Sequence, residues 1–145
     1  GTRPLAVGDR LNTDHVGARA AGIPGLHVLT GVSDARDVIA APATERPSFL
    51  HTDLRGLTEP HPEPVRTEQD GQVWWRVGNR SARALGSGLE LQDAGAVSSP
   101  DGTPVRIDLD SYRALAVAAW DWADAQGRSG EAAALELPEI EVIEP

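Results

Sequence analysis

The fold of this chain is decided by residues 4–31, PLAVGDRLNTDHVGARAAGIPGLHVLTG. A short apolar run, Leu5 to Val7, predicts a buried strand, and the small residues between Asp14 and Ala21 predict a helix that packs closely on a sheet. Gly22 stands where that helix is expected to end, and Leu26 to Thr30 predicts the next strand. Short apolar runs that alternate with helical patterns indicate βαβ units on a parallel sheet.

The same alternation continues along the chain. A helix is predicted from Asp34 to Ala41, with Ser33 as its N-cap and Pro42 as its terminator, and Phe49 to His51 is predicted as a third strand. The following stretch LTEPHPEPV, residues 57–65, carries three prolines, which exclude both a continuous helix and a central strand. We therefore expect a domain boundary there.

Beyond this boundary the pattern changes to antiparallel strands. Val65 to Gln69 and Gln72 to Val77 flank Asp70-Gly71, a pair that favours a two-residue hairpin turn, with Val73, Trp75 and Val77 on one face of the second strand. A further short strand is predicted within GSGLELQDAG, residues 86–95.

A long helix follows. Apolar residues recur at helical spacing from Leu109 to Ala125, with Asp108 or Asp110 as the N-cap and Gly127 at the end. The tail SGEAAALELPEIEVIEP, residues 129–145, is acidic and expected to be loosely held, although IEVI suits a strand added to an exposed edge.

Composition excludes several classes of protein. A chain of 145 residues is one domain, or a small domain with an appendage. The absence of Cys excludes disulfides, thiolate metal sites and a cysteine nucleophile, and fits a reducing compartment, so we expect a cytoplasmic protein. A net charge of −9 argues against nucleic acid as a partner, and no apolar run suggests a membrane span or secretory signal.

Two further residue types are missing, Lys and Met. All 13 basic residues are Arg, so the chain has no Lys, and it has no Met. The first residues also enter a predicted strand almost at once. We expect the chain to be the later part of a longer polypeptide.

Two carboxylates in the opening stretch suggest a metal. In a parallel sheet, ligands gather beyond the carboxyl ends of the strands, where Asp9 is expected, and Gly8 lets the backbone approach a ligand. Mg²⁺ prefers oxygen ligands and keeps several waters, so Asp9 is suited to bind it directly while Asp14 holds a metal-bound water. The alternative is that Asp14 only caps the helix and that Gly8-Asp9 is only a turn.

The stretch VGDRLNTDHVGARAAGIPGLHVLTGV closely resembles the last sequence motif of haloacid-dehalogenase (HAD) superfamily phosphatases. The resemblance is to the branch with NagD-like and 4-nitrophenylphosphatase-like enzymes, which includes phosphoglycolate and glycerol-3-phosphate phosphatases. It implies the carboxyl-terminal part of a Rossmann-like α/β parallel sheet, followed here by a small α+β appendage. The expected division is a hydrolase core in residues 1–57, a Pro-rich linker in 58–64, an accessory module in 65–127 and an acidic tail in 128–145.

The resemblance also implies roles for individual residues. Asp9 becomes a Mg²⁺ ligand, Asp14 supports the water shell of the metal, and the other residues that line the site are Gly8, Arg10, Asn12 and Thr13. Asn12 departs from the Asp that is common in the family. His15 stands where an aliphatic residue is usual and is expected to be exposed.

The family hydrolyses small phosphate esters through an aspartyl-phosphate. Its nucleophile and acid/base come from an Asp-x-Asp-Gly-Thr motif, which this chain lacks, and its phosphate-binding Lys is missing too. The similar run SSPDGTP, residues 98–104, has Ser99 at the place of the nucleophile and is interpreted as a turn on Asp101-Gly102. We therefore expect no catalytic residue in this chain and no activity from it alone, with the upstream part of the protein as its partner.

Other candidates are weaker. His15, His27, His51 and His61 lack the spacing of zinc ligands, and His27 and His51 are expected to be packed or surface residues of strands. The four Trp residues, all beyond residue 70, suit the core of a small domain better than a ligand groove. A homo-oligomer is also compatible with the sequence. The alternative function is a non-enzymatic binding or interaction module that keeps the metal loop, residues 8–14, as a scaffold.

Overall fold

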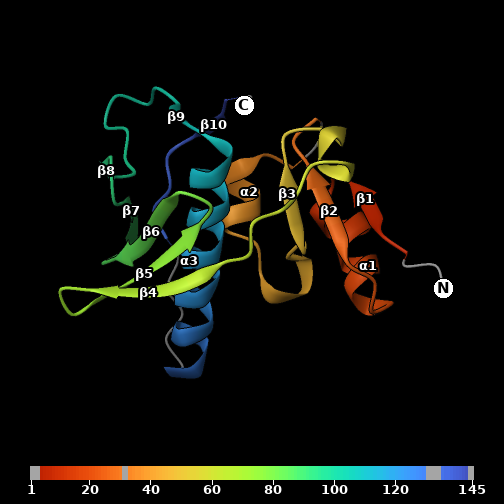
Figure 1. Ribbon diagram of the computed structural model, residues 1–145, viewed down its shortest axis with the longest axis horizontal. Helices are drawn as coiled ribbons and strands as arrows, with labels where there is room; N and C mark the ends of the chain where they lie inside the picture. The colour runs from red at the N-terminus through yellow and green to blue at the C-terminus, as the bar shows by residue number, and fades with distance from the viewer. Residues whose placement is uncertain (1–3, 31–32, 130–134, 144–145) are drawn as a thin grey trace. The chain divides into compact units, whose positions relative to one another are not determined.

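The computed structural model describes residues 4–30, 33–129 and 135–143, and the chain forms two compact units, Gly1–His61 and Pro62–Pro145 (Figure 1). The division falls inside the proline-rich stretch 57–65. Proline has no N–H to donate to a helix or a sheet, so neither a helix nor a strand continues through this stretch. Each unit has its own sheet.

The first unit is built on a three-stranded parallel sheet in the order β1 (Ala6–Gly8), β2 (Gly25–Val28), β3 (Phe49–His51). All four residues of the central strand β2 are buried, as expected for a parallel strand covered on both faces. Strand β3 has its predicted bounds, while β1 and β2 each differ from the predictions by one or two residues. The expected parallel α/β sheet is confirmed.

Helical segments connect these strands. A wide π-helical turn, η1 (Leu11–His15), continues into α1 (Val16–Ala20) between β1 and β2, and Gly22 ends it with a φ of +70°. Between β2 and β3 lie α2 (Ala35–Ile39) and the 3₁₀ turn η2 (Ala43–Glu45), and η3 (Leu54–Leu57) follows β3.

The N-cap of α2 corrects one prediction. Asp34, not Ser33, caps the helix: its Oδ1 accepts from the Asp37 N–H at 2.9 Å, and the Asp37 Oδ2 accepts from the Asp34 N–H at 3.0 Å. This reciprocal capping box satisfies two N–H groups that the helix start leaves unpaired. Ser33 is buried instead, and its hydroxyl accepts from the Leu11 N–H at 3.1 Å.

The second unit begins with the predicted hairpin. Its sheet has five antiparallel strands in chain order: β4 (Val65–Gln69), β5 (Gln72–Val77), β6 (Arg80–Leu85), β7 (Gly88–Leu91) and β8 (Gly95–Ala96). Asp70 and Gly71 have φ values of +52° and +76°, the pair of positive values that a type I′ turn requires. Strand β6 was not predicted, and the single strand expected in residues 86–95 is divided between β7 and β8.

Helix α3 (Leu109–Ser129) contacts β5, β6 and β7 (Figure 1). It runs to Ser129, so the predicted end at Gly127 is wrong. Tyr112 and Leu115 are fully buried on it, as are the small residues Ala114 and Ala116, which let the helix approach its neighbours closely. Val77, Ala82 and Leu89 are buried in the strands that α3 contacts.

The Trp residues belong to the packing of this unit. Trp74 is 8% exposed, and the Arg83 guanidinium lies 4.8 Å from its ring centroid. Arg83 also pairs with Glu90 at 3.1 Å, which holds the guanidinium over the ring. Trp75, Trp120 and Trp122 are half-buried. Trp74 thus fits the core interpretation, whereas the other three Trp side chains are only partly buried.

The tail adds a strand, as the IEVI pattern suggested. Strand β10 (Ile140–Val142) pairs in parallel with β9 (Val105–Ile107). The run SSPDGTP forms the expected turn, because Asp101 Oδ1 accepts from the Thr103 N–H at 3.0 Å and Gly102 has a φ of +80°. Within the described residues no helix has the combined length and apolar character needed to cross a membrane.

The start of α3 allows a stability prediction. Asp108 Oδ1 accepts from the Ser111 N–H at 2.8 Å, and Asp108 Oδ2 lies 2.8 Å from Arg80 Nε. Burial opposes ionisation, but the hydrogen bonds from Ser111 and Arg80 outweigh it and hold the pKa of Asp108 below its ordinary value. We expect Asp108→Ala to lower the free energy of unfolding by about 1–2 kcal/mol at pH 7, as lost N-caps do.

The difference between the two proteins should shrink as the pH falls through the lowered pKa, because protonation removes the carboxylate from the native wild type as well. This difference in the free energy of unfolding is measured by urea titrations that are monitored by Trp fluorescence, since all four Trp residues lie in the second unit. Asp121→Ala, an exposed position in the same helix, is the matched control and should change stability by less than about 0.5 kcal/mol. Equal effects of the two substitutions would contradict the capping role.

Candidate metal centre

The predicted site residues lie together in one short segment of the first unit. Gly8 ends β1, Asp9 follows it directly, and Asn12, Thr13 and Asp14 lie in the π-helical turn η1. Gly8 and Asp9 are half-buried, whereas Arg10 and the three residues of the turn are exposed. Asp9 thus lies at the carboxyl end of a parallel strand, where α/β sheets bind ligands.

Asp14 is folded back onto the start of this segment. Its Oδ2 accepts from the Arg10 N–H at 3.2 Å, and its own N–H donates to the Arg10 carbonyl oxygen at 3.0 Å. The carboxylate therefore closes the first turn from within η1, whereas the N-cap position, which the alternative gave to Asp14, is occupied by Arg10. The bond to the Arg10 N–H engages one of the two carboxylate oxygens, so closing the turn and a contact to a metal-bound water are compatible.

Gly8 makes room for the Asp14 side chain. A Cβ built on Gly8 would come within 2.5 Å of both Cβ and Cγ of Asp14, closer than atoms can approach. The absence of a side chain at Gly8 therefore lets the Asp14 carboxylate lie against the backbone next to Asp9. Two acidic residues in one short segment at a strand end supply the oxygen ligands that a hard cation such as Mg²⁺ prefers.

The chain does not hold a full set of ligands in its described part. Across residues 4–30, 33–129 and 135–143, no three His, Cys, Asp or Glu side chains come together as a metal-binding group. Mg²⁺ sites usually combine one or two carboxylates with water and substrate oxygens, so Asp9 and Asp14 suit a partial site.

A hollow of about 380 Å³ lies beside the segment, lined by Leu11, Asn12, Ser33, Asp37, Ala40, Ala41, Pro42 and Glu45. Asn12 is the one predicted site residue that lines it; Asp9 and Asp14 do not. Asn12 thus shares this hollow with residues of α2 and η2.

His15 is fully buried, so the expectation that it is exposed is wrong. Its Nε2 lies 3.1 Å from the Gly8 carbonyl oxygen. His27, in β2, is also fully buried, with Nε2 3.2 Å from the Asp9 carbonyl oxygen. Burial, and secondarily the neighbouring His15, lowers the pKa of His27 to about 4, so the His27 ring is neutral at pH 7.

These two histidines were missed as parts of the site. The signal in the sequence is a polar residue inside an apolar run, because His27 lies between Leu26 and Val28. A buried imidazole in such a strand needs a hydrogen-bond partner, and His27 finds it in the Asp9 carbonyl oxygen, just beyond the end of the neighbouring strand β1.

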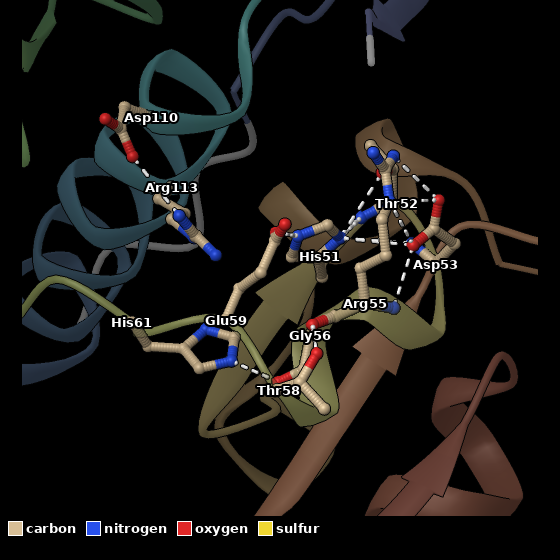
Figure 2. A network of polar contacts seen from close by, with 10 residues as sticks. All are labelled: His51, Thr52, Asp53, Arg55, Gly56, Thr58, Glu59, His61, Asp110 and Arg113. Carbon is tan, nitrogen blue, oxygen red and sulfur yellow. Dashed lines mark hydrogen bonds and ion pairs between the residues drawn. The ribbon is translucent and has the colours of Figure 1, made fainter. Parts of the chain in front are cut away.

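A second polar network lies at the end of β3 (Figure 2). The buried His51 accepts at Nδ1 from the Thr52 N–H at 2.9 Å, and its Nε2 lies 2.5 Å from Glu59 Oε1. The hydrogen bond from the Arg55 side chain lowers the pKa of Asp53 to about 2. The network ties the segment after β3 back to the sheet, and because His51 is fully buried it presents no ring nitrogen to a ligand.

A family model described as HAD-hydrolase-like matches residues 1–57. The chain is 37% identical over 123 residues to a D-glycerol 3-phosphate phosphatase of Mycobacterium tuberculosis, a match that covers 81% of this chain and 30% of that protein.

Solved structures extend the similarity over both units. A glycerol phosphate phosphatase from Mycobacterium tuberculosis in complex with magnesium matches 97% of this chain and 33% of its own, at 29% identity and a TM-score of 0.55. The structure with calcium matches 97% and 35%, at 29% identity and a TM-score of 0.52. The chain thus spans about a third of the length of the relatives it matches.

The family match falls on the unit that carries the parallel sheet and the segment with Asp9 and Asp14. The first unit therefore belongs to the haloacid-dehalogenase-like hydrolases, and glycerol phosphate phosphatases are among the relatives of the chain.

Proposed function

We propose that this chain is the carboxyl-terminal part of a Mg²⁺-dependent phosphatase that hydrolyses small phosphate esters, with glycerol phosphates as the first substrates to test. The observation that carries the proposal is the position of Asp9, at the carboxyl end of a parallel strand, with the Asp14 carboxylate packed against Gly8 beside it. The names of the relatives support the substrate class.

In this proposal the residues of the chain hold the metal and shape its surroundings. Asp9 binds Mg²⁺ directly, and Asp14 accepts a hydrogen bond from a metal-bound water while it closes the turn at Arg10. Gly8, Arg10, Asn12 and Thr13 line the site. When bound, Mg²⁺ neutralises charge on the phosphate. The nucleophile, the acid/base and a phosphate-binding Lys come from the upstream part of the protein, and hydrolysis proceeds through an aspartyl-phosphate.

The edge of the sheet supports an upstream partner. Strand β1 lies at the edge of the three-stranded sheet, and Leu5 and Val7 on either side of Ala6 are 39% and 40% exposed. Parallel sheets are normally covered on both faces and contain more strands than three. An upstream strand that pairs with β1 would cover these side chains and bring further residues next to Asp9.

The proposal assigns residues 1–57 to the hydrolase core, 58–64 to the linker, 65–127 to an accessory module and 128–145 to the tail. A cytoplasmic location stays a prediction, as does a homo-oligomer. A binding module that keeps the metal loop without catalysis is the alternative, and the test below separates it from the phosphatase.

The test compares two proteins, the 145-residue chain and the same chain extended to its upstream start. Both are assayed for hydrolysis of an aryl phosphate and of glycerol 3-phosphate, with Mg²⁺ and with excess chelator. We expect Mg²⁺-dependent turnover in the extended protein alone. Turnover by the 145-residue chain would contradict the assignment of the missing catalytic groups, and silence in both proteins would favour the binding module.

A further inference from the structure

Two buried imidazoles lie beneath the metal loop. His15 comes from the last position of η1 and His27 from the middle of β2, and their ring centroids are 5.3 Å apart with planes tilted by 44°. Both side chains have no exposed surface. Neither was assigned a role in the function proposed above.

The hydrogen-bond partners fix the tautomer of each ring. The Nε2 atoms of His15 and His27 face the carbonyl oxygens of Gly8 and Asp9, and a carbonyl oxygen can only accept. Each ring therefore carries its proton on Nε2 and donates it to the loop. The two Nδ1 atoms are then acceptors, and both are buried without a hydrogen-bond partner in the described structure.

Leaving a buried acceptor unpaired is unfavourable, and an apolar side chain at either place would avoid that cost. Such an unpaired group in a folded protein calls for an explanation other than stability. The explanation we find lies in the two carbonyl groups that the rings contact.

Those carbonyls belong to the two peptide groups that flank the Asp9 Cα. The Gly8 carbonyl oxygen is held by His15, and the Asp9 carbonyl oxygen is held by both His27 and the Ser33 N–H, at 3.2 and 2.9 Å. The other end of the second peptide group, the Arg10 N–H, donates to Asp14. With both peptide planes held, φ and ψ of Asp9 are fixed, and so is the direction in which its side chain leaves the backbone.

We propose that His15 and His27 are positioning residues that set the orientation of the metal ligand Asp9 through its two flanking peptide groups. This inference rests on the proposed function, because it takes Asp9 as the Mg²⁺ ligand. The histidines do not touch the metal or the substrate; they act through the backbone, as residues behind metal ligands commonly do.

The surroundings of the rings leave room for an imidazole. A Cβ built on Gly25 would lie 2.6 Å from His15 Nδ1 and 3.2 Å from its Cε1. Gly25 opens β2 directly behind the ring, so its lack of a side chain lets the His15 ring reach the Gly8 carbonyl.

The test measures Mg²⁺ affinity by calorimetry in the complete protein, extended upstream as above, and so does not depend on turnover. The variants are His27→Gln, whose amide nitrogen reaches as far as Nε2, and His27→Asn, an equally polar residue that is too short. We expect His27→Asn to weaken Mg²⁺ binding about 10-fold, as loss of a group behind a metal ligand does, and His27→Gln to restore most of it. Equal affinities for the wild type and His27→Asn would overturn the inference.

A matched control separates positioning from general damage to the sheet. His51→Asn replaces another fully buried histidine of the same sheet, whose partner is Glu59 and not the metal loop, and it should leave Mg²⁺ affinity unchanged. Asp9→Asn separates the two proposals. If Asp9→Asn does not weaken Mg²⁺ binding, the proposed function fails; if it does and His27→Asn does not, the positioning inference alone fails.

A second measurement tests the geometry in the 145-residue chain even if a variant does not fold. Long-range ¹⁵N–¹H correlation spectra of the imidazole rings distinguish Nε2–H from Nδ1–H tautomers. Protons on Nε2 of both His15 and His27 are expected. A proton on Nδ1 of either neutral ring would overturn the inference, since that ring would have no donor to offer the carbonyl.

Discussion

Asp9→Asn in the complete protein is expected to lower Mg²⁺ affinity and kcat/KM for phosphate esters by at least about 100-fold, because changes behind a metal ligand already cost about 10–100-fold. The substitution removes the charge and keeps the shape of the side chain. The Asp9 backbone contacts, to His27 and Ser33, use its carbonyl oxygen and remain. Turnover measured as a function of Mg²⁺ concentration gives both quantities, and wild-type turnover at ordinary Mg²⁺ would contradict the metal assignment.

Two further Asp→Asn substitutions calibrate this result. Asp14→Asn should have a smaller effect, about 10-fold on Mg²⁺ affinity, because an amide oxygen still accepts from the Arg10 N–H while the charge toward the water shell is lost. Asp70→Asn removes the same charge at the hairpin turn of the second unit, where Asn tolerates the φ of +52°. It should change neither Mg²⁺ affinity nor turnover, and a loss there would point to an effect of net charge.

Elements with a local signal could be predicted from the sequence. The hairpin around Asp70-Gly71 has its predicted bounds because the turn requires two positive φ values, and Gly accepts one at no steric cost. Strand β3 is also found where expected, as a short apolar run that begins soon after Pro47. Such signals depend on neighbouring residues alone, so no tertiary information is needed.

Elements set by tertiary contacts were harder to predict. Strand β6 contains Arg80, Arg83 and little apolar alternation, and it is a strand because it pairs with β5 and β7 on either side. The N-cap of α2 moved from Ser33 to Asp34 because the Ser33 hydroxyl is engaged by the Leu11 N–H, 22 residues away in sequence. A bond over that separation leaves no local pattern.

The candidate site shows the same division. The positions of Asp9 and Asp14, at a strand end and in the first helical turn, could be predicted, because both follow from the sequence pattern around them. The burial of His15 was not predicted, since the helix was expected to begin at Asp14. With the helical segment beginning at Leu11, residues Leu11, His15 and Ala18 share one buried face at spacings of four and three residues.

The close packing of the Asp14 side chain against Gly8 leads to the second prediction with a large expected effect. Gly8→Ala should lower the free energy of unfolding of the first unit by about 1–3 kcal/mol, as overpacking does. The added methyl group would come within 2.5 Å of Cβ and Cγ of Asp14, and Cβ cannot rotate away, so the turn η1 itself must move. Mg²⁺ affinity in the complete protein should fall as well, since this movement displaces Asp14 from its place beside Asp9.

Gly17→Ala in α1 is the matched control, with the opposite sign. A Cβ at Gly17 meets no atom within 4 Å, and replacing an exposed helical Gly by Ala stabilises a protein by about 0.4–1 kcal/mol. All Trp residues lie in the second unit, so the unfolding of the first must be followed by amide hydrogen exchange of β1 and β2. If both substitutions stabilise the unit, Asp14 is not held against Gly8, and the case for an Asp14 carboxylate packed at this strand end fails.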